Sequence, residues 1–383
     1  MSDCHLFFFV DAMGAAVIRG HPVIEDLGRT AALRSVFGYS SACVPSILSG
    51  RWPEEHLHWS YFTYRGPATG LKVPRWLRWL PPAVRDRGRV RHHLSKAVKR
   101  ANGIAGYFQM YMMPIDQLHQ YGHCEPRDIF QPGGMNTGGN IADLIAASGA
   151  APGTTWIADW HHQPDENWAA MRAKAADPKC RFMLMYDAAM DAWLHDHTRE
   201  SPLLDARLGE VRRELDAVLA AARAAHDRVL FYVFSDHGMC TVRRLVDLFP
   251  ALERTRLRMH ADYHCVIDST MVRAWYHGDE RVRATVRDAL SGIDGLRLLT
   301  PDEMKRERCA FPDNRFGDDF WLADPHVLLV PSHLGTVPMK GMHGYSCDHE
   351  DSDASFVTND PAAAPRTIVD VYRLMADAVH AVA

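Results

Sequence analysis

The sequence predicts an α/β fold: a three-layer α/β/α sandwich around a mostly parallel central sheet, with smaller inserted segments. Short apolar runs recur and end abruptly at a polar residue, at Leu6–Val10, Phe182–Tyr186, Val229–Phe234 and Val327–Val330. Runs that are apolar on both faces are typical of buried parallel strands. Between the runs lie segments of helical period, the clearest from Leu204 to Leu219. Strands that alternate with helices define this fold class.

The runs also indicate where a binding site lies. In open α/β sheets, ligands bind beyond the carboxyl ends of the strands. Asp11 directly follows the first apolar run, and Asp236 and His237 follow the third after a single serine. We therefore expect these three polar side chains at one edge of the sheet.

Two segments interrupt the alternation and predict the domain organisation. Residues 1–64, 141–249 and 326–383 form the expected core, and residues 250–325 a small α+β insertion. Residues 65–140 form a basic helical insertion or lid, in which eleven bases between Arg65 and Arg100 stand against the single acid Asp86, with Trp76 and Trp79 among them. A basic stripe with tryptophans fits an anionic substrate, a membrane surface or a carrier partner, and equally a solvated helix.

Composition excludes several classes of protein. The chain has 383 residues, of which 47% are hydrophobic and 23% charged, and a formal net charge of -4, which excludes disordered and coiled-coil chains. The near-neutral charge gives no indication of a nucleic-acid polymer as partner. No apolar run is long enough for a membrane span, and the N-terminal run lacks the basic start and cleavage site of a signal peptide. The eight cysteines are scattered, so we expect a cytoplasmic protein.

Two further motifs carry groups that bind metals. Asp191 and His195 are four residues apart, which places both side chains on one face of a helix. His343 lies between Gly341 and Gly344 in a loop-like stretch. Each motif alone is commonplace, because most Asp-His pairs lie on the surface and Asp236 alone would suit a helix cap. Their combination is what indicates a site.

Taken in order, Asp11, the Asp191–His195 pair, Ser235-Asp236-His237-Gly238-Met239 and the late His343-Gly344 resemble the alkaline phosphatase superfamily. The closest resemblance is to the type I phosphodiesterase and nucleotide pyrophosphatase family. It extends from Phe7 to Phe356, and the motifs at 235–239 and 340–345 are its most specific part.

The resemblance implies a site with two zinc ions, or manganese in a site this rich in aspartate. Carried over, Asp11, Asp236 and His237 hold one ion together with the nucleophile. Asp191, His195 and His343 hold the other. Mixed nitrogen and oxygen ligands with an open position are what a catalytic zinc site requires. The sequence departs from the family at Ala12, where members often carry glycine.

The expected nucleophile is Ser40. In the superfamily it begins a helix ten residues before a glycine, and Gly50 fits this count. A helix N-terminus also favours an incoming phosphate. Ser41 is the alternative. Cys43 lies in a stretch that superficially resembles a sulfatase motif, but Ile47 stands where that motif has arginine, which disfavours this reading.

The resemblance thus implies a hydrolase that cleaves small phosphodiesters or nucleotide pyrophosphates through a phosphoseryl intermediate on Ser40. The same site supports a phosphomonoesterase, a phosphonate hydrolase or a phosphoryl transferase, and a catalytically dead, metal-stabilised binding protein is an alternative of another class. The family's usual amide donor to the phosphate is missing near residues 55–61, where Tyr61, His58 or Ser60 are candidate replacements. The sequence does not indicate the physiological substrate or the oligomeric state.

Overall fold

The central layer of the protein is a six-stranded, mostly parallel sheet. The computed structural model describes residues 3–383 except 65, 67–69, 80 and 82–86. The strand order is β2-β16-β7-β1-β6-β5, with bounds Arg29–Leu33, Ala354–Thr358, Arg228–Phe234, Asp3–Val10, Phe182–Asp187 and Thr155–Ile157. β1 pairs in parallel with both β7 and β6, whereas β16 is antiparallel to its neighbours. The predicted fold class is therefore confirmed.

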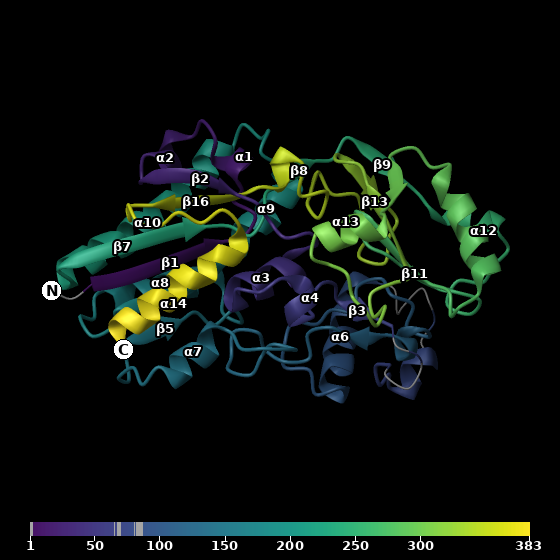
Figure 1. Ribbon diagram of the computed structural model, residues 1–383, viewed down its shortest axis with the longest axis horizontal. Coiled ribbons are helices and arrows are strands. Elements are labelled where there is room, and N and C mark those ends of the chain that lie inside the picture. The colour runs from purple at the N-terminus through teal and green to yellow at the C-terminus, as the bar shows by residue number, and fades with distance from the viewer. Residues whose placement is uncertain (1–2, 65, 67–69, 80, 82–86) are drawn as a thin grey trace.

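Strand β1 divides the interior into two cores because its side chains alternate between the two faces of the sheet. Leu6, Phe8 and Val10 pack into one buried cluster, and Phe7 and Phe9 pack into the other. Strand β1 therefore needs apolar side chains on both of its faces. Helices cover each face and make the three layers seen in Figure 1.

The helices that cover the sheet come from different parts of the chain. On the face of Phe8, α8 (Pro164–Ala175) and α10 (Leu204–Ala225) pack together, with α1 (Ala15–Ile18) and α2 (Pro22–Glu25) beside them. On the face of Phe7 lie α3 (Ser40–Ser49), α7 (Ile141–Ala147) and α14 (Val371–Val382). The helical period from Leu204 thus corresponds to the long helix α10.

A smaller antiparallel sheet lies beside the core, at the right of Figure 1. Its order is β10-β11-β13-β12, with bounds His264–Ile267, Met271–Trp275, Asp319–Ala323 and Leu296–Leu298. Helices α11 (Phe249–Arg254), α12 (Glu280–Ser291) and α13 (Pro301–Arg306) accompany it. Buried Arg273 on β11 pairs with Asp268 at 2.8 Å and donates to the Phe62 carbonyl at 2.7 Å, which ties this sheet to β3 (Phe62–Thr63).

One predicted strand has a different place from the one expected. The run from Val327 forms β14 (Val327–Leu329), but this strand pairs in parallel with β9 (Arg244–Val246) in a separate two-stranded sheet. An apolar run shows that a strand is buried, not which strand it pairs with. Two further ribbons, β15 (Gly341–Met342) with β8 (Cys240–Thr241) and β3 (Phe62–Thr63) with β4 (Gly122–His123), complete the sheets.

The basic segment contains the 3-10 helix Arg75–Trp79 and the helix α6 (Gly88–Ala101). Of the predicted basic stripe, Arg65, Leu80, Arg85 and Asp86 lie outside the described residues, as do the side chains of Arg75 and Arg78. Helix α9 (Ala189–His197) and helix α4 (Pro53–His56) complete the longer elements that surround the site. Among the helices that the structure describes, none is both long and apolar enough to cross a bilayer.

Candidate active site

The loop after β1 carries Asp11 into a buried position at the carboxyl edge of the sheet. Tyr186, at the end of the neighbouring strand β6, donates its hydroxyl to Asp11 Oδ2 at 2.6 Å. Ala12 has φ +60°, a left-handed conformation that costs an L-residue about 1–2 kcal/mol. Its backbone N–H donates to Asp236 Oδ1 at 3.2 Å. The chain thus keeps at Ala12 a strained turn in which family members often have glycine. The hydrogen bond from Ala12 links the turn after Asp11 to the second carboxylate, Asp236.

Asp236 and His237 follow β7, one strand away from Asp11. Asp236 is fully buried, and its Oδ1 also accepts the His237 backbone N–H at 3.0 Å. Ser35 donates its hydroxyl to the Asp236 carbonyl at 2.6 Å. Gly238 is required because a Cβ there would lie 2.3 Å from the Asp351 carbonyl oxygen.

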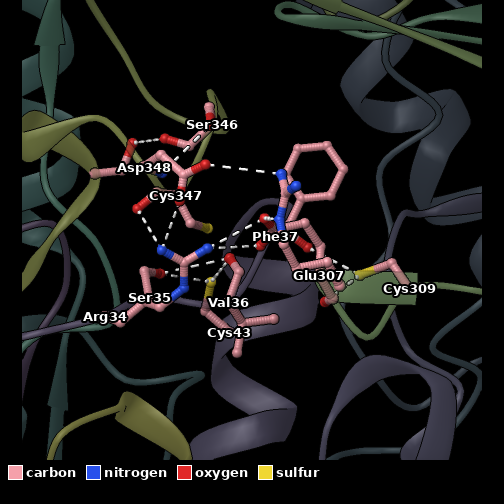
Figure 2. Close-up of polar contacts among 12 residues, drawn as sticks. Arg34, Ser35, Val36, Phe37, Cys43, Glu307, Cys309, Ser346, Cys347 and Asp348 are labelled. Atoms are coloured by element: carbon pink, nitrogen blue, oxygen red, sulfur yellow. Dashed lines mark hydrogen bonds and ion pairs between the residues drawn. The ribbon is translucent and has the colours of Figure 1, made fainter. Parts of the chain in front are cut away.

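A polar network fixes the segment that leads from β2 to helix α3 (Figure 2). The Arg34 guanidinium donates to Glu307 Oε1 at 3.1 Å and to Asp348 Oδ1 at 2.9 Å. It also donates to the Cys347 carbonyl at 3.2 Å. Arg34 thus joins the start of this segment to the smaller insertion and to the loop that follows His343.

Ser40 is the first residue of helix α3, where the initial backbone N–H groups have no partner within the helix. Its Oγ lies 3.1 Å from His237 Nε2. Ser41, the alternative, has a buried hydroxyl that donates to the Trp59 carbonyl at 2.9 Å. Cys43 is buried within the same helix, and burial raises the pKa of its thiol well above the usual value. Of the two candidate serines, Ser40 is therefore the one whose hydroxyl lies beside a predicted ligand.

His343 reaches the site through the ribbon of β15 with β8. Gly344 follows it with φ +85°, and a Cβ at this glycine would lie 2.6 Å from the Tyr39 ring. The same close approach sets the His343 ring 5.7 Å from the Tyr39 ring, edge to face. Asp191 and His195 lie one turn apart on α9, as their spacing predicts.

The structure brings all seven predicted site residues together. One group is the predicted set Asp191, His195 and His343, whose ligand atoms lie within 4.8 Å of one another. The distance from Asp191 to His195 Nε2 is 3.4 Å, and that to His343 Nε2 is 3.6 Å. In the other group, His237 Nε2 lies 3.5 Å from Asp11 Oδ1 and 3.2 Å from Asp236 Oδ2.

The two groups are not separate, because Asp191 belongs to both. Its carboxylate also lies within 4.8 Å of ligand atoms of Asp11 and His237. The rings of His237 and His343 stack with their centroids 3.8 Å apart. Asp191 thus stands between the two groups, a position that residue spacing alone did not indicate.

The carboxylates are held at a high electrostatic cost. Burial, together with the charges of Asp236 and Asp191, raises the pKa of Asp11 well above its usual value. Burial raises the pKa of Asp236 to about 7. Burial acts in the same direction on Asp191, but the hydrogen bond with His195 and the nearby His343 outweigh it, so the pKa of Asp191 is lowered. Three carboxylates in one dry site require positive charge to stay ionised.

The chemistry of these atoms fits bound metal ions. Asp11 Oδ1, Asp191 Oδ1, Asp236 Oδ2 and His343 Nδ1 are buried without a hydrogen-bond partner. His195 Nδ1 lies 2.8 Å from the Gly341 carbonyl and His237 Nδ1 lies 2.9 Å from that of Gly238. A ring nitrogen beside a carbonyl acts as the donor, so Nε2 of each ring presents its lone pair to the site. That these residues bind metal remains a prediction.

A cavity of about 370 Å³ opens from these residues, and Asp11, Ser40, Asp191, His195 and His343 all line it. Tyr61 also lines it, whereas the other two candidate phosphate donors, His58 and Ser60, are buried outside its lining. His58 Nε2 instead accepts the Asn136 backbone N–H at 3.0 Å.

Sequence reasoning missed the other lining residues. Tyr186 was identified only as the end of a strand, although alternation along β6 places it on the face of Phe182 and Leu184, at the carboxyl edge of the sheet. The aromatic residues Tyr107, Tyr111 and Trp160, together with Glu125, also line the cavity. No motif marks them, because irregular chain between 102 and 160 brings them there.

A mostly parallel sheet that gathers carboxylates, imidazoles and the first serine of a helix at one edge is the arrangement expected of a metal-dependent hydrolase of phosphate esters. The family model described as type I phosphodiesterase / nucleotide pyrophosphatase matches residues 6–346, and the chain belongs to this family. The family acts on ester bonds and is metal-dependent, so the protein is an enzyme of the hydrolase class.

Solved structures share the fold at low sequence identity. Murine ectonucleotide pyrophosphatase / phosphodiesterase 5 is 15% identical, with a TM-score of 0.69 over 98% of this chain and 95% of that one. The human protein of the same name is 14% identical, with a TM-score of 0.66 over 98% and 94%. An inactive variant of the murine protein in complex with AMP is 15% identical, with a TM-score of 0.68 over 99% and 95%. A search of curated proteins finds no match.

Proposed function

We propose that the protein hydrolyses monoanionic phosphodiesters through a covalent intermediate on Ser40. The proposal rests on family membership and on one observation about the cavity: among its described lining residues there is no lysine or arginine. A phosphomonoester dianion requires an additional positive charge, whereas a diester carries a single negative charge. The 65–140 insertion supplies aromatic and apolar residues to this lining, and none of its described bases.

Ser40 is the nucleophile in this proposal. Its Oγ attacks phosphorus, the P–O bond to the leaving alcohol breaks, and water then releases the phosphoryl group from Ser40. The N-terminus of α3 directs backbone N–H groups toward the phosphate oxygens. Tyr61 is the lining residue that we propose as the side-chain donor to the phosphate in place of the family's amide.

We propose zinc as the metal, with manganese as the alternative that an aspartate-rich site supports. Asp11, Asp236 and His237 would hold one ion, and Asp191, His195 and His343 the other. When bound, two such ions lower the pKa of a hydroxyl and neutralise a leaving oxygen. The free Nε2 atoms of His195 and His237 support a nitrogen-binding metal over magnesium.

Substrate preference tests this proposal. We expect kcat/KM of the zinc-loaded enzyme to be at least ~10-fold higher for bis-p-nitrophenyl phosphate than for p-nitrophenyl phosphate, because a second negative charge left unpaired costs about 1.4 kcal/mol or more. Release of p-nitrophenol measures both reactions. A preference for the monoester would contradict the diesterase proposal and favour a phosphatase. No turnover of either ester, with metal bound, would favour a phosphonate hydrolase, a transferase or a binding protein.

We further propose that residues 65–100 form a peripheral contact with an anionic membrane surface. Trp79 is 86% exposed and Trp76 is 56% exposed, and the same segment carries exposed Arg87, Arg89 and Lys96 at and along α6. Exposed tryptophans and bases in one segment suit the boundary between lipid headgroups and water.

We also propose that the enzyme is cytoplasmic. This proposal is supported by the eight cysteines, all of which are free.

Vesicle cosedimentation tests the membrane contact. We expect binding to vesicles that contain phosphatidylserine at low salt, and at least ~10-fold weaker binding at 0.5 M salt, because basic residues near the surface act through screened charge. The variant Trp79→Ala should bind more weakly, whereas Leu203→Ala, which changes another exposed apolar residue outside the segment, should not. Equal sedimentation with and without phosphatidylserine would contradict the contact and leave a carrier protein as the alternative partner.

A further inference from the structure

A second group of metal-binding side chains lies beside the turn that follows β7. Cys240 is the first residue of β8, three residues after His237. His349 caps the short 3-10 helix Glu350–Ser352, and Asp351 lies within that helix. One ligand atom of each of Cys240, His349 and Asp351 lies within 4.8 Å of the other two. We call these three residues the Cys240 cluster.

The Cys240 cluster is separate from the active-site cavity. None of its three residues is among the described residues that line the cavity. Cys240 is 1% exposed and Asp351 is 2% exposed, whereas His349 is half-buried and forms the side of the cluster that is open to solvent. The cluster also differs in chemistry, because it contains a sulfur atom and the predicted active-site ligands contain none.

The distance between the sulfur and the imidazole fits a tetrahedral zinc ion. Cys240 Sγ lies 3.6 Å from His349 Nδ1. Zinc bonds of about 2.3 Å to sulfur and about 2.0–2.1 Å to nitrogen, at a tetrahedral angle, separate the two ligand atoms by about 3.5–3.6 Å. His349 Nδ1 also accepts the Asp351 backbone N–H at 3.3 Å. The neutral ring therefore carries its proton on Nε2, and Nδ1 is the basic nitrogen that a metal binds.

Asp351 supplies negative charge to the cluster. Its Oδ1 lies 3.0 Å from Arg199 Nη2, but in a geometry that makes no hydrogen bond. Carboxylates that bind metals are commonly oriented by a further donor, and Arg199 has that place here. Burial and the charge of Asp351 raise the pKa of the Cys240 thiol. This thiol therefore keeps its proton until a metal ion replaces it.

We propose that Cys240, His349 and Asp351 bind a zinc ion distinct from the two predicted active-site ions. Binding releases the thiol proton to solvent and forms bonds from zinc to Sγ, Nδ1 and a carboxylate oxygen. The fourth position is left to water or to His326, whose ring adjoins that of His349 with 5.4 Å between centroids. The thiolate favours zinc over magnesium and calcium, which take oxygen ligands. The inference does not rest on the proposed function, because it involves no substrate.

An ion in the Cys240 cluster holds two parts of the active site together. Cys240 continues the turn that carries His237, and β8 pairs with β15, which leads to His343. The carbonyl oxygen of Asp351 approaches Gly238 so closely that a Cβ there would lie 2.3 Å from it. Zinc bound to both segments thus fixes the turn after β7 against the loop that follows His343. Its role is positioning, because the ion does not reach the cavity.

Cobalt substitution tests this inference. Co²⁺ bound to a thiolate absorbs in the near ultraviolet by charge transfer from sulfur, whereas Co²⁺ bound to imidazoles and carboxylates alone lacks this band. The band therefore reports the Cys240 cluster and not the predicted active-site ions. We expect the full-length protein, stripped of metal by a chelator, to gain the band when Co²⁺ is added. With zinc, elemental mass spectrometry should find one more ion per chain in the wild type than in Cys240→Ser.

Variants then assign the band to the cluster. Cys240→Ser and His349→Ala should each lose it. The ring of His349 is half-buried, so its replacement leaves the buried thiol and the packing around it in place. The matched control is Cys265→Ser, which removes an equally buried free thiol on β10 and should keep the band.

The outcomes separate this inference from the proposed function. A wild type that gains no band with Co²⁺ would overturn the zinc site, as would a band that persists in both Cys240→Ser and His349→Ala. Loss of the band in Cys265→Ser alone would assign the cobalt to another thiol and would also overturn it. Turnover of bis-p-nitrophenyl phosphate is measured on the zinc-loaded samples. The cobalt band without any turnover would support the zinc site and contradict only the proposed function.

Discussion

Replacing Ser40 by alanine is expected to lower turnover of bis-p-nitrophenyl phosphate by at least ~1,000-fold, the scale of loss when a covalent nucleophile is removed. Ser40 begins α3, and its Oγ lies 3.1 Å from His237 Nε2. No alkoxide remains in the variant to form the phosphoseryl intermediate. Steady-state release of p-nitrophenol measures the loss, and mass spectrometry of the acid-quenched wild type detects the added p-nitrophenyl phosphoryl group.

The matched control is Ser41→Ala, because the two serines are neighbours and differ in where their hydroxyls point. Ser41 donates to the Trp59 carbonyl, so its removal costs a buried hydrogen bond but no nucleophile. We expect it to retain at least ~10% of activity, with a loss of stability of about 1 kcal/mol. The metal content of Ser40→Ala, measured by elemental mass spectrometry, should equal that of the wild type. Full activity in Ser40→Ala, or the larger loss in Ser41→Ala, would contradict the assignment.

The positions of two site carboxylates were accessible to sequence reasoning for a physical reason. Asp11 directly follows a strand that is buried on both faces, Asp236 follows another after one serine, and parallel neighbours end at one edge of the sheet. The pairing of Asp191 with His195 could be predicted from their helical spacing alone. The polar residues that local periodicity places at element ends are thus the ones that the structure gathers.

The rest of the site depends on packing that has no local signal. Asp191 lies between both groups because the tertiary fold brings the first turn of α9 beside Asp11 and His237, which the spacing within the helix does not determine. Glu125, Tyr107 and Tyr111 of the cavity lining belong to irregular chain, where neither period 2 nor period 3.6 applies. Likewise Val327–Leu329 reads as a buried strand, but its partner β9 is chosen by the tertiary fold.

Removal of the metal ions is the second change with a large expected effect. Dialysis against a chelator should lower turnover at least ~1,000-fold and also lower the melting temperature. Asp11, Asp191 and Asp236 then face one another in a buried site without cations. A ligand present at ~1,000 times its Kd stabilises a fold by about 4 kcal/mol, which sets the scale of the shift. Differential scanning fluorimetry with zinc or manganese added back measures it and identifies the preferred ion.

The shared carboxylate makes this prediction specific to a residue. Asp191 lies within 4.8 Å of ligand atoms in both groups, so Asp191→Asn should weaken binding of both ions, whereas His195→Ala should weaken one. Asp196→Asn, an exposed aspartate on the same helix, should leave metal content and activity at wild-type values. Isothermal titration calorimetry of metal binding to each variant distinguishes these cases. Unchanged stoichiometry and melting temperature in Asp191→Asn would mean that this carboxylate is not a ligand, and the metal site would have to be built from Asp11, Asp236 and the histidines alone.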